Sequence, residues 1–444
     1  MSYLGYWKII HPDWRIHMRS VGVLIVGAGA SGLMAAIGAK KYTKNVLIID
    51  KLNQPGKKIL ATGNGRCNYT NYCQKPEFYH SSENGFAWSI IKRFGYKDTI
   101  DIFSDMGIMP VDRDGYVYPA SGQAVSVRNV LRRELEKKKT EIHLEERVID
   151  IEEHVNSKTG EKDGYIVSTD KDKYLAKKVI LTTGGKAAPV HGSDGDGYTL
   201  GSKLGHSISR PVPALTSCVI GDKFSKDWTG IRVKGKVTAY DEKEHELASD
   251  TGELQMISYG ISGIPVFQIS RYISLELSKG CRPYIVMDIM PLYDMSVIID
   301  EIKKRIYNYP DGSIADIFEG MLHQKLTSAL LNSCGISPAK KACEIHTDDI
   351  EKIAGKMKSW RLNVTDTGDF TKAQVTCGGI STEEITADTM ESKIAGNLYF
   401  AGELVDVDAI CGGYNLQWAW SSGYIAGTSA GKAVADIKKR AAVK

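Results

Sequence analysis

The stretch Val23-Leu-Ile-Val-Gly-Ala-Gly-Ala-Ser-Gly-Leu-Met-Ala-Ala-Ile-Gly-Ala-Lys40 decides how this chain folds. Its apolar start, residues 23–26, predicts a buried strand, and a helix of small residues begins near Ala30. Between them, Gly27, Gly29 and Gly32 form G-x-G-x-x-G. The first glycine permits a sharp turn, the second lets backbone N–H groups approach a pyrophosphate, and the third lets the helix pack closely on the strand.

The residues that follow support a dinucleotide site over an ordinary strand–helix–strand unit with incidental glycines. A second apolar strand, residues 45–49, ends at Asp50, which lies 18 residues beyond Gly32. A carboxylate at this position accepts hydrogen bonds from the hydroxyls of an adenosine ribose. Lys51 follows directly and adds a positive charge at the same edge.

A glycine-rich loop comes next. Residues 56–71 include Gly63 and Gly65, with Lys57, Lys58 and Arg66 beside them. Successive backbone N–H groups in such a loop can bind phosphate, ribityl or flavin oxygens. A plain surface loop is the alternative, but its position beside a nucleotide motif favours one that faces a ligand.

Composition restricts the class of protein. The 444 residues exceed what one compact core usually holds, so two or three domains are expected. The apolar fraction of 42% and the charged fraction of 25% are ordinary for a soluble globular protein. A net charge of +4 is small for this length and favours neither nucleic acid nor an anionic membrane as partner.

The eight cysteines form no C-x-x-C pair, so reduced thiols in the cytoplasm fit best, and no metal site is expected. The sequence has no apolar run of membrane-spanning length, and its first 20 residues do not resemble a secretory signal. We expect a small-molecule substrate, without nucleic acid or membrane, and leave the oligomeric state open.

Changes of pattern along the chain divide it into four segments. Residues 1–20 are expected to be an extension outside the core fold. Met18 stands where a dinucleotide-binding protein usually begins, a few residues before its first strand. Residues 21–211 form the first part of a nucleotide-binding domain, including a strand from Lys178 that ends at Gly184 and Gly185. Residues 212–358 read as an inserted domain, part barrel and part helical, and residues 359–444 return to the first domain.

The carboxyl-terminal segment contains a last strand, residues 395–403, and then Gly412-Gly-Tyr-Asn-Leu-Gln-Trp-Ala-Trp420. Apolar and small residues recur at helical spacing from 416 to 437 and predict a long helix that lies closely on the sheet. Its N-terminus, near Asn415, would present a positive helix end, which suits the flavin edge that becomes negative on reduction.

These motifs, together with Gly65-Arg-Cys-Asn-Tyr-Thr-Asn71 and Val375-Thr-Cys-Gly-Gly-Ile380, resemble those of the BaiN-like flavoproteins, a family that also includes enzymes called aminoacetone oxidases. The resemblance covers nearly the whole chain after residue 20. It implies noncovalent FAD in a Rossmann-like α/β domain of the two-dinucleotide-binding type, interrupted by an inserted β-barrel plus helical domain. The implied and derived cofactor residues are Gly27, Gly29, Ala30, Ser31, Gly32, Asp50, Lys51, Lys58, Gly65, Arg66, Cys67, Asn68, Val148, Gly184, Gly185, Gly402, Glu403, Asp408, Asn415, Leu416 and Gln417.

The sequence departs from the family at two positions. Many relatives have glycine where Ala409 stands, and relatives often carry His or Asp where this chain has Ser258. A proton donor inferred for those relatives therefore does not transfer to this chain.

Three residues are weak candidates for a catalytic role. Cys67 is separated from Cys73 by five residues, which does not match the spacing of redox disulfides, so a structural role is favoured. Cys411 stands beside a glycine pair and could face the flavin. Tyr259 lies in the glycine-containing stretch 257–265, which is expected either to cover the flavin or to be a packing turn of the barrel.

The leading interpretation is an FAD-dependent oxidoreductase that transfers a hydride through the flavin, with NAD(P)H as a candidate reductant. The resemblance implies reduction of a steroid-like enone or, alternatively, amine oxidation with oxygen. A plain NAD-dependent dehydrogenase and a flavin-carrying binding protein without catalytic activity are the other readings. No second G-x-G-x-x-G follows a strand, so any nicotinamide would have to dock directly on the flavin.

Overall fold

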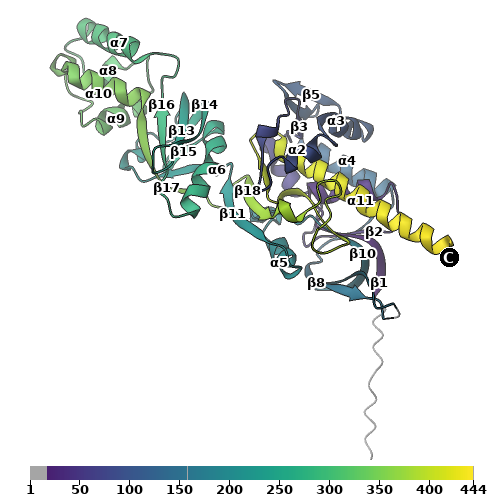
Figure 1. Ribbon diagram of the computed structural model, residues 1–444. Helices are drawn as coiled ribbons and strands as arrows, with labels where there is room; N and C mark the ends of the chain where they lie inside the picture. The colour runs from purple at the N-terminus through teal and green to yellow at the C-terminus, as the bar shows by residue number, and fades with distance from the viewer. Residues whose placement is uncertain (1–17, 158, 444) are drawn as a thin grey trace, which may run out of the picture.

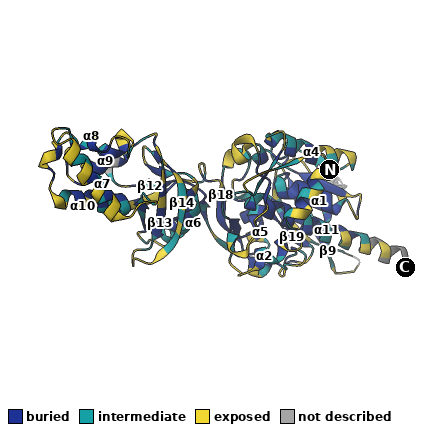
Figure 2. Ribbon diagram, turned by 90° about the horizontal axis from the view of Figure 1, so that it is seen from above, coloured by how far each residue is buried: buried dark blue, intermediate teal, exposed yellow. Residues whose placement is uncertain are grey.

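The computed structural model describes residues 18–157 and 159–443, so the first 17 residues of the expected extension lie outside the described residues. Figure 1 shows an elongated molecule with two lobes. We call residues 18–217 and 368–443 the large lobe and residues 218–367 the inserted lobe. Each lobe has its own buried core, and Figure 2 shows the buried residues gathered inside each of them.

A seven-stranded sheet organises the large lobe. Its strands are β7 (Glu141–His143), β2 (Val46–Ile49), β1 (Arg19–Val26), β10 (Lys173–Leu181), β9 (Lys162–Thr169), β8 (Val148–Val155) and β19 (Leu398–Phe400). The first four are parallel to one another, and β19 joins β10 in parallel where β9 ends. The strands β8 and β9 are antiparallel additions to this sheet. The strand expected from Lys178 begins earlier, since β10 starts at Lys173.

Two helices cross the same face of this sheet in close contact. They are α1 (Ala30–Ala39) and α11 (Tyr414–Val443). A Cβ atom built on Gly427 would overlap the carbonyl oxygen of Ala35, and one on Gly431 would lie 2.8 Å from that of Ala39. Glycines four residues apart on α11 therefore allow the two backbones to touch. The long helix was expected to lie on the sheet, and the structure adds α1 as its closest neighbour.

The chain between β2 and β7 forms a layer around the start of α11. It contains a 3₁₀ segment, η1 (Lys58–Gly65), and the elements β3 (Thr70–Asn71), β4 (Tyr79–Ser81), α2 (Phe86–Ile91), α3 (Tyr96–Asp105), β5 (Pro110–Arg113), β6 (Tyr116–Pro119) and α4 (Ala124–Lys137). The strands β3, β6 and β5 form a small sheet, and β4 pairs with β20 (Val407–Ala409). Further along the chain, α5 (Asp196–Lys203) follows β10.

The inserted lobe is a closed barrel with helices at one end. The barrel order is β12 (Cys218–Ile220), β15 (Gly260–Ser262), β14 (Glu246–Ile257), β13 (Arg232–Tyr240), β16 (Tyr284–Asp288) and β17 (Trp360–Thr367). Its helices are α6 (Ile264–Ser278), α7 (Met295–Asn308), α8 (Ile314–Ile317), α9 (Gln324–Ser333) and α10 (Thr347–Lys358). Helix α6 lies on the side of the barrel toward the large lobe, whereas the other four lie at the far end (Figure 1).

The lobes are joined through β11 (Ile208–Ala214) and β18 (Val375–Ile380), which pair antiparallel. The expected boundary at 211/212 falls inside β11. The expected end of the insert, residue 358, precedes β17, and β17 pairs with both β12 and β16. The barrel therefore includes residues beyond 358, because its last strand is supplied only after the helical segment returns.

Candidate functional site

The turn between β1 and α1 has the geometry expected of its glycines. Gly27 has φ of +106°, and a Cβ atom there would lie 2.6 Å from the carbonyl oxygen of Thr182. A Cβ atom on Gly32 would overlap the carbonyl oxygen of Gly27. At Gly29, by contrast, a Cβ atom would meet no atom of the protein within 4 Å, because this residue faces a cavity. The backbone around Gly29 is thus open to a ligand.

Asp50 stands at the end of β2 beside this turn. Its Oδ2 accepts a hydrogen bond from the backbone N–H of Ala28 at 2.6 Å, and its Oδ1 accepts one from Leu52 at 2.7 Å. Burial raises the pKa of the Asp50 carboxyl, although both backbone donors oppose that shift. The carboxylate is therefore held rigidly at the edge of the cavity, where a ribose would need it.

The cavity runs along the carboxyl ends of β1, β2 and β10 and has a volume of about 1230 Å³ including its open mouth. This is the edge at which ligands bind in open α/β sheets. Among the residues singled out from the sequence, those that line it are Gly27, Gly29, Ala30, Ser31, Asp50, Lys51, Lys58, Val148, Gly184, Glu403, Asn415 and Leu416.

Two ion-pair groups close the cavity at different places. Lys51 Nζ lies 2.6 Å from Asp194 and 2.7 Å from Asp196, and Arg147 contacts the same two carboxylates. Elsewhere along the cavity, Lys58 Nζ lies 2.7 Å from Glu403. Each group joins chain segments that are distant in the sequence, so the cavity has charged walls on more than one side.

The N-terminus of α11 meets the cavity as expected. The side chain of Asn415 accepts a hydrogen bond from the N–H of Ala409 at 3.0 Å and donates one to its carbonyl oxygen at 2.8 Å. Gly413 has φ of +93°, and a Cβ atom there would lie 2.7 Å from the carbonyl oxygen of Thr70. These contacts fix the glycine turn, so the positive end of the helix is aimed by its neighbours rather than by α11 alone.

The structure places two other expected cofactor residues away from the cavity. Gln417 is fully buried, and its amide bonds Thr70 and Thr99 on the opposite side of α11. Asp408 is the neighbour of cavity-lining Val407 on β20, so its side chain points to the other face of the strand, where it pairs with Arg271 of α6.

The remaining expected residues surround the cavity without lining it: Gly32, Gly65, Arg66, Cys67, Asn68, Gly185 and Gly402. Gly32 and Gly402 serve close packing, since a Cβ atom on either would collide with its neighbours. The side-chain oxygen of Asn68 is buried, and no hydrogen-bond partner for it exists among the described residues. The roles of these residues toward a cofactor stay predictions.

The catalytic candidates lie in three different environments. Burial raises the pKa of the Cys67 thiol to about 12 and that of Cys411 to about 11, so neither is a ready nucleophile at neutral pH. Neither forms a disulfide. Tyr259 is 37% exposed in the turn before β15, with Lys372 Nζ 4.3 Å from its ring centre. The glycine of that turn packs against β12, since a Cβ atom on Gly260 would overlap the carbonyl oxygen of Cys218.

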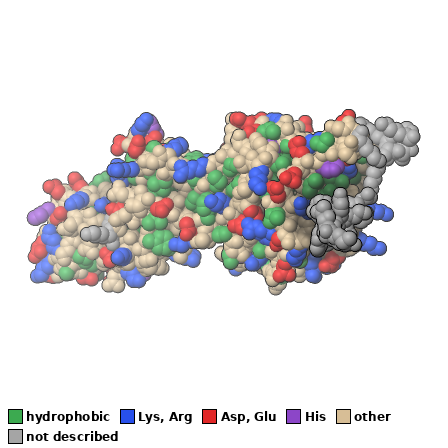
Figure 3. Space-filling view, turned by 90° about the horizontal axis from the view of Figure 1, so that it is seen from below, with side chains coloured by type: hydrophobic (Ala, Val, Ile, Leu, Met, Phe, Trp, Pro, Cys, Tyr) green, Lys and Arg blue, Asp and Glu red, His purple; other side chains and the backbone are tan. Residues whose placement is uncertain are grey.

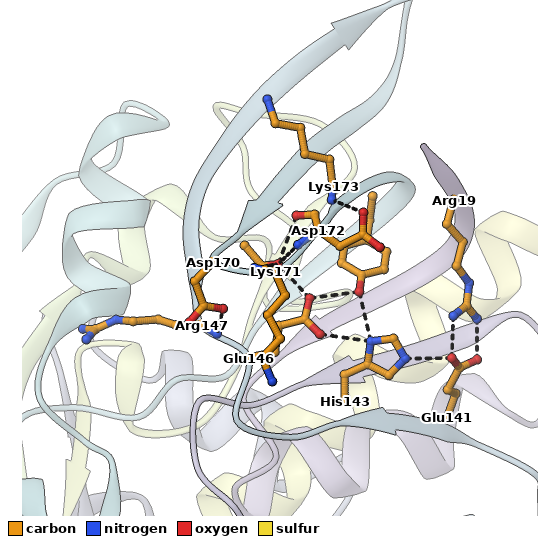
Figure 4. A network of polar contacts seen from close by, with 11 residues as sticks. Arg19, Glu141, His143, Glu146, Arg147, Asp170, Lys171, Asp172 and Lys173 are labelled. Carbon is orange, nitrogen blue, oxygen red and sulfur yellow. Dashed lines mark hydrogen bonds and ion pairs between the residues drawn. The ribbon is translucent and has the colours of Figure 1, made fainter. Parts of the chain in front are cut away.

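The sequence did not single out several residues that the fold brings to the cavity. Glu146 lines it at 4% exposure, and its Oε1 accepts hydrogen bonds from Thr169 and Tyr174 at 2.7 and 2.9 Å. Its Oε2 lies 3.1 Å from His143, which continues the network to Glu141 and Arg19 (Figure 4). The only sequence signal for Glu146 was an acidic residue between two expected strands. That signal does not show that its carboxylate bonds residues of β7, β9 and β10.

The residues present fit FAD. A long cavity runs from the first glycine turn to the N-terminus of α11, a glycine leaves space for a pyrophosphate, and a buried carboxylate stands at the ribose position. Within residues 18–157 and 159–443 there is no group of three or more His, Cys, Asp or Glu residues that could hold a metal ion. In the same residues, no helix is long and apolar enough to cross a membrane.

The fold and the cavity define an FAD-binding flavoprotein with a Rossmann-like domain and an inserted barrel. The family described as "HI0933-like protein Rossmann domain" matches residues 21–429, and the chain belongs to this family. The resemblance to BaiN-like flavoproteins is confirmed, and the protein is an oxidoreductase.

Three relatives match over nearly their whole length. The chain is 39% identical to the 3-dehydro-bile acid delta(4,6)-reductase of Clostridium scindens, with 93% of this chain and 99% of that protein covered. It is 30% identical to the ribosomal RNA dihydrouridine synthase of Haemophilus influenzae, covering 90% and 96%. The corresponding Escherichia coli protein is 27% identical, covering 92% and 97%.

Among solved structures, the 3-ketosteroid-delta4-(5alpha)-dehydrogenase of Rhodococcus jostii RHA1 matches with a TM-score of 0.47 and 13% identity, covering 96% of this chain and 98% of that one.

Proposed function

We propose that this flavoprotein reduces a carbon–carbon double bond conjugated to a carbonyl group, in a small and largely apolar substrate of the steroid-enone kind. The observation that carries this proposal is the 39% identity to a bile acid reductase along almost the full length of both chains. FAD, when bound, supplies the hydride for such a reduction, and the protein supplies binding, orientation and the proton.

The relatives named as ribosomal RNA dihydrouridine synthases support reduction of the same type of double bond. Dihydrouridine arises from uridine by addition of two hydrogens across a ring double bond that is conjugated to a carbonyl group. A reductase of bile acid enones and a dihydrouridine synthase therefore need the same chemistry at the reacting carbons. The substrate, rather than the reaction, separates the two groups of relatives.

The residues of this chain have defined tasks in this proposal. The turn at Gly27 and Gly29 and the carboxylate of Asp50 would bind the pyrophosphate and ribose of the cofactor. The N-terminus of α11 would stabilise negative charge at the flavin ring, and Lys58 with Glu403 would bound the cavity near η1. We propose NADH or NADPH as the reductant, docking directly on the flavin.

A proton must complete the reduction, and Tyr116 is our candidate donor. Its ring packs on Gly412 just before α11, where a Cβ atom would lie 2.8 Å from Tyr116 Cε1. Burial raises the pKa of this phenol, and Cys411, Tyr118 and Asp250 of the barrel raise it further, so it keeps its proton at neutral pH. The group therefore lies where the two lobes face each other, as a donor to a substrate between them must.

Tyr259 remains the competing donor, and the two phenols can be compared directly. Removing only the hydroxyl of the true donor, as Tyr116→Phe or Tyr259→Phe, should lower substrate turnover by about 10²-fold or more, with flavin content unchanged. The other variant serves as the matched control. Turnover at the wild-type rate in both variants would leave water as the donor and would contradict a tyrosine role.

The proposal is tested by anaerobic spectroscopy of the holoenzyme. The flavin should bleach on addition of NADH or NADPH and regain its colour with a conjugated steroid dienone, forming the reduced steroid. Reoxidation by oxygen alone, with turnover of aminoacetone, would support the oxidase alternative and contradict the reductase. A flavin that no nicotinamide reduces would remove NAD(P)H from the proposal without excluding another reductant.

Reduction of uridine in ribosomal RNA is the second candidate, because two relatives carry that name. The net charge of +4 is small, and Figure 3 shows acidic and basic side chains interspersed on one face of the molecule. Extended phosphate backbones favour a surface of one sign. We therefore propose the small molecule first, acting in the cytoplasm, and expect no dihydrouridine in ribosomal RNA treated with the reduced enzyme.

A further inference from the structure

A second cavity lies at the seam between the lobes, with a volume of about 990 Å³ including its mouth. Arg271 of α6 forms the wall from the inserted lobe, and residues around β4 and α2, among them His80, Tyr79 and Trp88, form the rest. No lining residue is shared with the flavin cavity. Strand β20 separates the two, because Val407 faces the flavin cavity and Asp408 faces Arg271.

Arg271 places a guanidinium in the wall of this cavity, and only some of its N–H donors have an acceptor among the described residues. Its Nε donates to both carboxylate oxygens of Asp408, at 3.0 and 2.8 Å, and the two side chains are only 18% and 3% exposed. Among the described residues, none accepts a hydrogen bond from its terminal nitrogens Nη1 and Nη2. A guanidinium has five N–H donors, and the terminal nitrogens of Arg271 are not among the fully buried atoms that lack a partner, so they reach the open space of the cavity. The outer edge of this guanidinium is therefore free to bind an acceptor in the cavity.

His80 and two aromatic side chains complete the site. His80 stands opposite Asp408 in the β4–β20 pair, and its ring centre lies 6.0 Å from that of Tyr272. Burial lowers the pKa of His80, so the neutral ring offers one further N–H donor at neutral pH. Tyr79 and Trp88, with ring centres 6.5 Å apart, form an apolar wall beside these polar groups.

We propose that this seam cavity binds a small organic carboxylate with a flat apolar body. The carboxylate would accept two hydrogen bonds from the outer edge of Arg271, which matches it in shape, and a third from His80. The apolar body would lie against Trp88. Because Asp408 already neutralises Arg271 and Glu77 lies at the same cavity, a singly charged anion with apolar surface suits the site better than phosphate.

This site is distinct from the proposed catalytic function, since its ligand would not touch the flavin. It would instead contact α6 of the inserted lobe and β4 of the large lobe at once. Binding would therefore favour the arrangement of the two lobes in which Arg271 and Asp408 stay paired, as a ligand that contacts both sides of an interface must.

The test is calorimetric titration of the holoenzyme with benzoate and indole-3-acetate, and with benzamide as the neutral comparison. We expect saturable binding of both carboxylates, at least tenfold weaker binding of benzamide, and no change in the flavin absorption spectrum. If neither carboxylate shows saturable binding at concentrations up to about 10 mM, the proposal is overturned, because the dissociation constant would then be weaker than about 10 mM. Equal binding of benzamide, competition by phosphate at equal concentration, or a shifted flavin spectrum would also overturn it.

Two variants locate the binding. Asn84→Trp fills the mouth of the cavity and leaves the Arg271–Asp408 pair intact, so it should weaken benzoate binding at least tenfold while flavin content stays constant. Glu83→Trp, on the neighbouring residue outside the lining, is its matched control and should bind as the wild type does. Unchanged binding in Asn84→Trp would show that benzoate sits elsewhere. Reductase activity is not needed for any of these measurements, so failure here and failure of the proposed function are distinguishable.

Discussion

Replacing Gly29 by valine separates cofactor binding from folding. The backbone at Gly29 has φ of −75° and ψ of −170°, which every residue tolerates, and an added Cβ atom would meet no protein atom within 4 Å. As the N-cap of α1, the glycine is worth only a few tenths of a kcal/mol to about 1 kcal/mol over an apolar residue. The apo protein should therefore be as stable as the wild type to within about 1 kcal/mol.

The same side chain would fill the space in which the pyrophosphate approaches the turn. If two hydrogen bonds from the backbone to the charged phosphates are lost, at about 1.5–3 kcal/mol each, binding weakens by about 3–6 kcal/mol. This corresponds to a dissociation constant for FAD about 10²–10⁴-fold higher. The assay is titration of the apo protein with FAD, followed by flavin fluorescence, together with thermal unfolding of the apo form.

Gly396→Val is the matched control, because a Cβ atom there also meets nothing within 4 Å and the residue lies outside the cavity. It should bind FAD as the wild type does. Gly32→Val should instead fail to fold, since its Cβ atom would overlap the carbonyl oxygen of Gly27. A Gly29→Val protein that binds FAD within threefold of the wild type would refute the pyrophosphate site. A Gly29→Val protein that does not fold would refute the inference that the space beside Gly29 is open in the apo protein.

Three further predictions concern the core, a thiol and the network of Figure 4. Gln417→Leu leaves Thr70 and Thr99 without their buried partner and should lower the free energy of unfolding by about 2–4 kcal/mol, measured by urea denaturation. Burial raises the pKa of Cys411 to about 11, so its alkylation by iodoacetamide in the native holoenzyme should be about 240-fold slower at pH 8 than that of an ordinary thiol. The alkylation rate should still be rising at pH 10, and a plateau near pH 9 would contradict this. Arg19 and His143 lower the pKa of Glu141 to about 2, so its contribution is complete above the unfolded pKa near 4.5 and is lost as the pH falls toward 2. Glu141 is 43% exposed, so Glu141→Gln should cost at most about 1 kcal/mol at pH 7, and the difference from wild type should shrink below pH 4.5 and be lost as the pH falls through about 2.

The sequence was informative wherever function depends on neighbours along the chain. The G-x-G-x-x-G turn, the acid at the end of the second strand and the glycine pair before the last helix each belong to one continuous segment. Their backbone geometry follows from residue type alone, since only glycine accepts φ of +106° at Gly27 without strain. The structure therefore has the local geometry expected of these segments, which depends on no distant contact, and their roles toward a cofactor stay predictions.

The sequence was less informative where the direction of a side chain matters. Asp408 and Gln417 lie next to residues that line the cavity, and the motif suggested that they share that role. A strand turns alternate side chains to opposite faces, and a helix turns each residue by about 100°. Which face meets the cofactor depends on what packs behind it, here Arg271 from the inserted lobe and Thr70 from β3.

The barrel shows the same limit on a larger scale. Its last strand, β17, returns to β12 after more than a hundred intervening residues, and the long strand β14 was not expected at all. Alternation of exposed and buried residues along β14 is incomplete, so its pattern is weak. The pairing of β12 with β17 that closes the barrel stabilises both strands only after the chain between them has folded.

By itself the sequence determined a Rossmann-like domain for a dinucleotide, the glycine turn that approaches it and the interruption by an insert, because these follow from local periodicity and from the few residues that tolerate special backbone geometry. FAD as the particular dinucleotide was what the family resemblance implied. Only the tertiary structure decided the walls of the flavin cavity, the opposite faces of β20 and the seam site around Arg271. Those features join residues that lie far apart in the chain. Their contacts have no local signal, because the cavity walls join distant segments of the large lobe and the seam site needs α6 of the inserted lobe beside β4 and β20.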